Sequence, residues 1–403
     1  MLCGRRRPPV RDLWARRAAG GLRPGTDARG IAHGLGHHEG GLVKLALIYE
    51  LPVPRPWGPD SAYHAFENTL QEIELADRLG FHSVWTVEHH FLDEYSFSSA
   101  PGVFYGSIAA RTQNIRIGHG VRLLPFPYNH PVRAAEAAAT VDVLSKGRLE
   151  FGTGRSGTRI EIEGFGISPP ETRPMWEEAL DVIVGSWTEE EFSWHGKYFK
   201  LPPRGVVPKP YQQPHPPIWG ATSSADSHEI VGRKGLGLLS FSVAIPPEGL
   251  TKRIGRYREG LEQVRPVGKF VNNRIATFAQ AHCAETTAQA HEDAKTAFPW
   301  YIQSSLKTIA ELGAWQEGTN LGSYEYARKL LGGMSLEDLT FDYLVRNETV
   351  LCGDPEHFLQ MCRRYEAVGV DVLMLLVQSY DIPHEKVMRS IELIGTEVLP
   401  KLS

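Results

Sequence analysis

Short apolar segments alternate with amphipathic segments from Val43 almost to the end of this 403-residue chain. An apolar run of strand length, followed by apolar residues spaced three and four apart, predicts one strand and one helix. The chain contains eight candidate strands, which begin near Val43, Ser83, Ile115, Arg148, Pro217, Leu236, Asn273 and Val370. Because right-handed helical crossovers close a parallel sheet of this size, the pattern predicts a (β/α)8 TIM barrel with insertions. An open, doubly wound sheet is the alternative.

Helices are expected between these strands, over 62–79, 103–111, 131–144, 174–187, 226–234, 247–264, 286–309 and 383–399. Two connections are longer than an ordinary barrel loop. Residues 189–213 contain aromatic residues and prolines, and we interpret them as a small hairpin. Residues 311–348 contain the pair Gly332-Gly333 and predict a mobile flap over the barrel mouth.

Residues 1–42 differ in composition from the rest of the chain. They combine many arginines with clusters of glycine and proline, and they show no helical periodicity, which is typical of disorder. We therefore expect a disordered tail over 1–42, with the native chain beginning near Val43, and a barrel domain over 43–403.

Charge and cysteine content argue against several classes of protein. A formal net charge of -4 leaves no basic surface for nucleic acid or an anionic membrane, and no apolar run is long enough to span a bilayer. The four cysteines show no CxxC spacing, so neither a metal site nor a disulfide scaffold is indicated. These features are typical of a cytoplasmic globular protein.

The segment SVWTVEHHF, from Ser83 to Phe91, contains the first candidate site residues. It is an apolar strand that ends in a carboxylate, Glu88, and two imidazoles, His89 and His90. Catalytic residues of parallel α/β folds gather at the carboxyl ends of strands, because the following loops open there. A solvated loop start is the alternative interpretation.

A glycine-rich segment, FGTGRSG, follows the fourth strand and matches the dinucleotide-binding pattern at Gly152, Gly154 and Gly157. No clean helix follows it, which argues against a Rossmann fold. We interpret it as an open loop that admits an anionic group, with Arg155 as a bidentate donor.

Hydroxyl groups follow the fifth strand at Thr222, Ser223, Ser224 and Ser227. They are helix caps in the simplest interpretation, but a helix N-terminus is also an anion site. Because adjacent strand ends converge in a barrel, one phosphate is expected to contact both this segment and Arg155.

From Val43 onward the chain resembles the bacterial luciferase-like family of flavin-dependent monooxygenases, which are TIM barrels. The resemblance is densest over FHSVWTVEHHF and over the run from Ile108 to Arg155, and it ends at Gly164–Gly166. It implies that His89 is the catalytic histidine and Glu88 its neighbouring carboxylate. It also implies a non-prolyl cis peptide at Gly120-Val121, beneath the flavin ring.

The same resemblance implies that Arg155 and Ser224 contact the flavin phosphate, that Ser223 contributes its backbone and that Ser227 contributes a hydroxyl. Two positions depart from luciferase proper: Gly154 stands where that enzyme has a cysteine, and Ser227 replaces a threonine. These departures argue against light emission as the role.

The function implied by the resemblance is a monooxygenase that uses reduced FMN and O₂ to oxygenate a small lipophilic substrate. A separate flavin reductase would supply the reduced cofactor, and a homodimer is expected from the family. Tyr49, Trp57 and Tyr128 are candidate pocket residues. Hydride transfer with the deazaflavin F420 is the first alternative, and a non-catalytic barrel subunit is the second.

Overall fold

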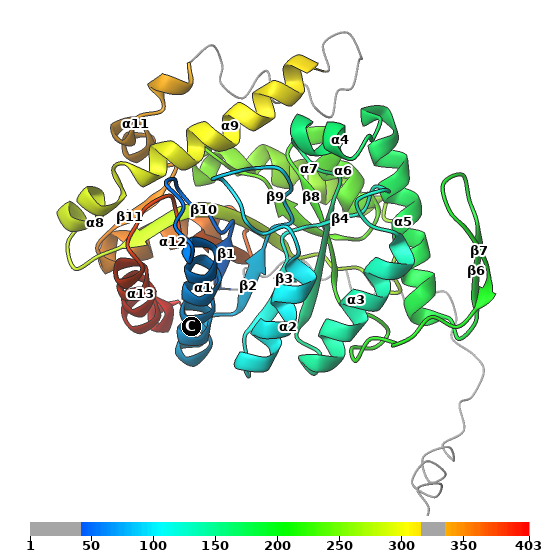
Figure 1. Ribbon diagram of the computed structural model, residues 1–403. Helices are drawn as coiled ribbons and strands as arrows, with labels where there is room; N and C mark the ends of the chain where they lie inside the picture. Colours follow the sequence, from blue (N-terminus) through cyan, green and yellow to red (C-terminus); the bar gives the residue numbers. More distant parts are fainter. Residues whose placement is uncertain (1–41, 316–334, 403) are drawn as a thin grey trace, which may run out of the picture. The chain divides into compact units, whose positions relative to one another are not determined.

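A computed structural model describes residues 42–315 and 335–402 of the chain. Residues 1–41 of the predicted tail and 316–334 of the predicted flap lie outside the described residues, so neither prediction is tested there. The barrel domain is shown in Figure 1, with its helices wrapped around a ring of strands.

Eight parallel strands form a closed barrel, which confirms the predicted fold class and excludes the open sheet. Each strand pairs with the next in the ring, and β9 pairs with β10 to close it. In ring order the strands are β1 (Lys44–Tyr49), β2 (Ser83–Thr86), β3 (Arg116–His119), β5 (Leu149–Gly154), β8 (Ile218–Thr222), β9 (Gly237–Ser240), β10 (Ile275–Cys283) and β12 (Val372–Leu376). Two short strands pair outside this ring, β4 (Arg122–Leu123) with β5 and β11 (Leu351–Gly353) with β10.

The outer helices match the predicted segments closely. They are α1 (Ser61–Leu79), α2 (Pro101–Arg111), α3 (Pro131–Leu144), α5 (Thr172–Thr188), α6 (Ala225–Arg233), α7 (Thr251–Glu262), α8 (Thr287–Ala294), α9 (Ala297–Trp315) and α13 (His384–Leu393). The segment predicted as one helix over 286–309 is two helices, α8 and α9. In α1 the buried residues Leu70, Ile73 and Ala76 recur at helical spacing, and Gly80 ends the helix with a φ of 86°.

Within residues 42–315 and 335–402, the helices α4 (Arg159–Gly164), α11 (Phe341–Arg346) and α12 (Pro355–Ala367) were not predicted. The start of α12 nevertheless has clear sequence signals, because Asp354 caps the helix by accepting from the His357 N–H and Pro355 is its first residue. This helix lies between the predicted connection over 311–348 and β12.

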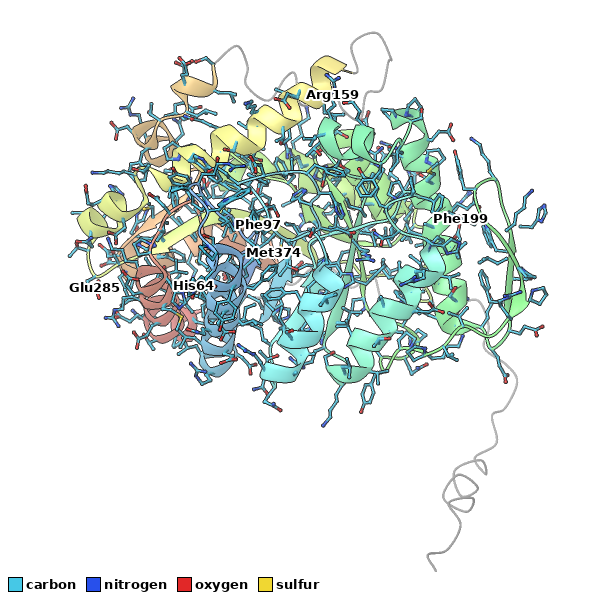
Figure 2. The ribbon with its side chains drawn as sticks, in the orientation of Figure 1. His64, Phe97, Arg159, Phe199, Glu285 and Met374 are labelled. Carbon is cyan, nitrogen blue, oxygen red and sulfur yellow. The ribbon has the colours of Figure 1, made fainter. Side chains whose placement is uncertain are left out.

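The predicted hairpin is present as β6 (Phe192–His195) and β7 (Lys200–Arg204), which pair antiparallel and project beside α5 (Figure 1). Glu178 of α5 anchors its turn by accepting from Trp194 Nε1 at 3.0 Å and from the backbone N–H of Phe199 at 2.9 Å. Phe199 is labelled in Figure 2 beside α5.

Two fully buried tryptophans, Trp85 on β2 and Trp219 on β8, pack together inside the barrel. The rings of Trp85 and Trp219 pack edge to face with centroids 5.6 Å apart. A Cβ at Gly118 would lie 2.1 Å from the Trp85 ring, and one at Gly237 would lie 2.4 Å from the Trp219 ring. Glycine is therefore required at these two strand positions, because any side chain there would overlap an indole ring.

Buried Glu150 ties four barrel strands together beside this aromatic pair. Its carboxylate accepts from Trp219 Nε1 at 2.7 Å and from Arg274 at 2.9 Å, and it also pairs with Arg116. These residues come from β3, β5 and β8 and from the position just before β10.

Helix α9 crosses the end of the barrel at which the strands finish, as Figure 1 shows. Its residues Ser305, Thr308 and Ile309 face a cavity at that end. Among the described residues, no helix combines the length and apolarity that a membrane span requires.

We expect Glu150→Ala to lower the free energy of unfolding by about 3 kcal/mol, because it leaves the buried Trp219 indole N–H without its acceptor and removes the carboxylate partner of two partly buried guanidinium groups. Urea denaturation measures this difference. Glu163→Ala is the matched control, since the Glu163 carboxylate is exposed and pairs with exposed Arg159, and the change there should stay within about 0.5 kcal/mol. Equal stability of the two variants would contradict the prediction.

Candidate active site

A cavity opens at the carboxyl ends of the barrel strands, and every one of the eight strands, or the loop after it, contributes to its wall. The predicted site residues that line it are Glu88, His89, Gly120, Val121, Arg155, Ser223 and Ser227. Residues far apart in the sequence are therefore brought together as expected. Ser224 lies directly behind this wall, where its hydroxyl contacts the Ser227 hydroxyl at 2.7 Å and caps α6.

His89 lies in the loop after β2, between two buried carboxylates. Its Nδ1 is 3.0 Å from Glu161 Oε1, and its Nε2 is 3.5 Å from Glu50 Oε2. The backbone N–H of His89 donates to the carbonyl of Ser98 at 3.0 Å, which fixes the position of the residue. The imidazole is thus hydrogen-bonded at Nδ1 and has a second carboxylate near Nε2.

Glu161 is the first functional residue that the sequence analysis did not identify. It is 0% exposed, and its Oε1 accepts from the His90 N–H at 2.9 Å as well as facing His89. Its Oε2 accepts from the hydroxyls of Ser156 at 2.8 Å and Thr158 at 2.6 Å. A signal was present, because Thr158 and Glu161 form a Thr-x-x-Glu helix start directly after the glycine loop.

Glu50 is the second residue that was missed, and it directly follows β1. Its Oε1 accepts from the hydroxyls of Tyr301 at 3.2 Å and Tyr95 at 3.4 Å. Its Oε2 has no hydrogen-bond partner among the described residues. A carboxylate immediately after a buried apolar strand is the same signal that identified Glu88.

The environment sets the charge of this cluster. Burial disfavours the imidazolium of His89, but Glu161 and then Glu50 outweigh it and raise the pKa of His89 to about 9. Burial also opposes ionisation of Glu161, yet the charge of His89 and the hydrogen bonds it receives lower the pKa of Glu161. Burial raises the pKa of Glu50, an effect that His89 and Tyr301 partly offset.

The Glu88 carboxylate is directed to the loop after β3 rather than to His89. It accepts from the Leu123 N–H at 3.0 Å and from Asn129 Nδ2 at 2.9 Å, and Arg122 lies 3.6 Å away. This loop follows the Gly120-Val121 peptide, which is cis, in agreement with the expectation from the resemblance.

Packing explains why glycine stands at position 154, where luciferase has a cysteine. A Cβ at Gly154 would lie 2.5 Å from Cγ2 of Val121. A side chain at position 154 would therefore displace Val121, which lines the cavity in this protein.

A cationic, hydroxyl-rich region forms another part of the cavity wall. Arg155 donates to Thr172 Oγ1 and Arg173 donates to Ser227 Oγ, each at 3.2 Å. The first turn of α6 adds Ser223 and Ser227 to the same wall. Arg173 was not predicted, because a single arginine in a helix carries no pattern, and only packing places it beside Arg155.

The remaining wall is largely apolar, with Ile48, Val87, Leu239, Phe278, Ile309 and Met374 among its residues. Met374, on β12, is labelled in Figure 2 near the middle of the barrel. Tyr49, Trp57 and Tyr128 are not among the described residues that line this cavity, although they were candidates.

Comparison with known proteins assigns the family. A family model described as luciferase-like monooxygenase matches residues 51–372, which is most of the chain. This chain belongs to the luciferase-like monooxygenase family. The oxygenase component of the flavin-dependent trigonelline monooxygenase of Acinetobacter baylyi is 25% identical over 348 residues, which cover 84% of this chain and 90% of that protein.

Two solved structures share the fold of this luciferase-like protein. The oxygenating constituent of 3,6-diketocamphane monooxygenase from Pseudomonas putida, in complex with FMN, has a TM-score of 0.70 at 22% identity and covers 89% of this chain and 99% of its own. An F420-dependent secondary alcohol dehydrogenase, in complex with an F420-acetone adduct, has a TM-score of 0.65 at 17% identity and covers 90% and 99%. Both likenesses show that this chain has the same barrel fold as these two oxidoreductases.

We expect His89 of this luciferase-like protein to stabilise the fold in a pH-dependent way. Since the folded pKa of about 9 exceeds the ordinary value of 6.5, its contribution is fully present below pH 6.5 and is lost as the pH rises through 9. The difference in free energy of unfolding between the wild type and His89→Gln should shrink by about 3 kcal/mol over that range. Urea denaturation at a series of pH values measures it.

His119→Gln provides the control. Burial lowers the pKa of His119 well below its ordinary value, so His119 stays neutral in the folded protein across this range. The corresponding difference for His119→Gln should be flat above pH 6.5. A flat curve for His89→Gln as well would contradict the assignment of a charged His89.

Proposed function

We propose that this protein is a monooxygenase that uses reduced FMN and O₂ to oxygenate a small lipophilic substrate. The observation that carries the proposal is one cavity with two different polar regions. Arg155, Arg173 and the serines of α6 form a cationic region, and His89 with its two carboxylates forms the other. Largely apolar side chains make up the remaining wall, which suits a lipophilic substrate.

The residues present fit FMN. Two guanidinium groups, hydroxyls and the N-terminus of α6 suit a dianionic phosphate. Gly120, Val121 and Gly154 line one part of the wall without any polar side chain, which suits a flat ring. Glu50 Oε2, buried without a hydrogen-bond partner in the described structure, suits a polar group of a bound molecule. When bound, reduced FMN supplies the electrons for O₂ activation, so that one oxygen atom enters the substrate and the other leaves as water.

Each residue has a proposed role in this scheme. Arg155 and Arg173 bind the phosphate, together with the Ser223 backbone and the Ser227 hydroxyl, while Ser224 caps α6 and orients Ser227. Gly120 and Val121 support the flavin ring.

His89 holds or transfers the proton at the reacting end of the cavity, and Glu88 supports the loop that follows the cis peptide. Largely apolar walls beneath α9 exclude water from this end.

A separate flavin reductase is the proposed source of reduced FMN. The relative from Acinetobacter baylyi is the oxygenase component of its monooxygenase, which supports the same division of labour here. A homodimer and a cytoplasmic location remain predictions from the sequence.

Hydride transfer with F420 is the second candidate, supported by the fold shared with the F420-dependent alcohol dehydrogenase. Labelling with ¹⁸O₂ separates the two. A monooxygenase places one labelled atom in the product of a lipophilic alkene or ketone when reduced FMN is supplied. Reduced F420 supporting turnover without labelled product would overturn the FMN proposal.

We expect Arg155→Ala and Arg173→Ala each to weaken FMN binding by roughly tenfold to a hundredfold, because each removes a charged hydrogen bond to the phosphate. Quenching of flavin fluorescence, with oxidised FMN as the probe, measures the affinity. Riboflavin, which lacks the phosphate, should bind the variants and the wild type equally. Arg159→Ala is the control, since Arg159 pairs with Glu163 on the surface of α4. Equal losses for riboflavin and FMN would place the phosphate elsewhere.

We expect His89→Ala to lower turnover by roughly a hundredfold to ten-thousandfold, the usual effect of losing a general acid or base. The rate of labelled product formation measures turnover at saturating reduced FMN. Turnover equal to that of the wild type would remove His89 from the mechanism.

A further inference from the structure

The two carboxylates that flank His89 are bonded in opposite ways. Both oxygens of Glu161 are occupied by donors, from His89, His90, Ser156 and Thr158. In contrast, Glu50 uses only Oε1, and its Oε2 faces His89 Nε2 at 3.5 Å without a hydrogen bond. Both side chains are more than nine-tenths buried, and Glu50 lines the cavity.

This asymmetry determines which ring nitrogen of His89 carries a fixed proton. The His90 N–H can only donate, so Oε1 of Glu161 must accept, and the same oxygen faces Nδ1 of His89. Nδ1 therefore donates to Glu161 and keeps its proton. Nε2 is left as the nitrogen that gains or loses a proton, and it faces Glu50.

We propose that Glu161, His89 and Glu50 form a proton relay in which Glu161 is a positioning residue and Glu50 exchanges a proton with Nε2 of His89. In that step the Nε2–H bond breaks and an Oε2–H bond forms, and the imidazolium and the carboxylate both become neutral. The transfer needs no other reactant. It rests on the proposed function only for the identity of the molecule that the relay serves.

Glu88 does not compete for this role, although it is adjacent in sequence. Its oxygens accept from Leu123 and Asn129. The titratable groups that face the His89 ring are Glu161 from α4, Glu50 after β1 and Tyr95, with Glu88 acting only through its charge.

The wild-type protein alone tests the role of Glu161. Above its pKa, a free histidine favours the tautomer with the proton on Nε2. We expect His89 instead to retain its proton on Nδ1 at pH 10, and ¹⁵N chemical shifts of the imidazole ring report this directly. A proton on Nε2 at pH 10 would overturn the assignment of Glu161.

Glu161→Gln tests the same role by titration. Removing an opposite charge at hydrogen-bond distance should lower the pKa of His89 by about 1 to 3 pH units. Glu163→Gln, two residues away on the exposed face of α4, is the matched control and should leave the titration unchanged. An unchanged titration in Glu161→Gln would overturn the proposal, and the wild-type tautomer stays informative if that variant does not fold.

Glu50→Gln tests the proton transfer. The substitution keeps the size of the side chain and its contact with Tyr301 but removes the proton acceptor. We expect turnover at saturating reduced FMN to fall by roughly a hundredfold or more, with the loss of one limb of its pH profile. A wild-type pH profile in Glu50→Gln would overturn the role of Glu50.

The two proposals fail in distinguishable ways. If the wild type neither binds FMN nor uses reduced FMN, the proposed function fails, while the tautomer and the titration of His89 still decide the role of Glu161. If the wild type is active and the two variants match it, only the relay fails.

Discussion

Closure of the parallel sheet is the constraint on which the rest of the structure depends. Pairing of β9 with β10 joins the two ends of the sheet, so all eight strands finish at one rim. Parallel strands carry their following loops on the same side. Glu50, His89 and Glu161, which come from the ends of β1 and β2 and the segment after β5, therefore meet without any sequence proximity. In the barrel interior, the buried rings of Trp85 and Trp219 pack together, and Glu150 accepts from the Trp219 indole.

The cavity wall contains two regions of different charge, the His89 cluster with its carboxylates and the region of Arg155 and Arg173. A pKa of about 9 for His89, compared with the ordinary 6.5, means that the folded protein stabilises the imidazolium by about 3 kcal/mol relative to a histidine in water. Burial alone would produce the opposite shift, so the preference comes from the carboxylates and not from exposure to solvent. Elsewhere in the cavity wall, Arg155 and Arg173 donate to hydroxyls and form a cationic region. A bound molecule with an anionic tail and a reactive ring would be oriented by these two regions.

Whether a site residue could be predicted depended on how clearly the surrounding sequence marks it. His89 and Arg155 follow clear apolar strands and lie in the distinctive segments EHH and GTGR. Both line the cavity as expected. Glu161 and Arg173 lie in helices among other charged residues, where a functional carboxylate or guanidinium looks like a solvated one. The helix α12 was also missed, although Asp354 and Pro355 are clear sequence signals for its start.

The alternation of barrel strands and outer helices, the closed parallel barrel and the rim that carries the site could all be predicted from the sequence, whereas α4, α11 and α12 were missed. Apolar periodicity, turn residues and polar groups at strand ends are local properties, so they can be recognised in the sequence alone. Only the tertiary structure decided which carboxylates serve His89, because Glu50 and Glu161 reach it through barrel closure and burial, whereas Glu88, its neighbour in sequence, points to another loop. Hydrogen-bond partners depend on distances between elements, and no spacing along the chain encodes those distances.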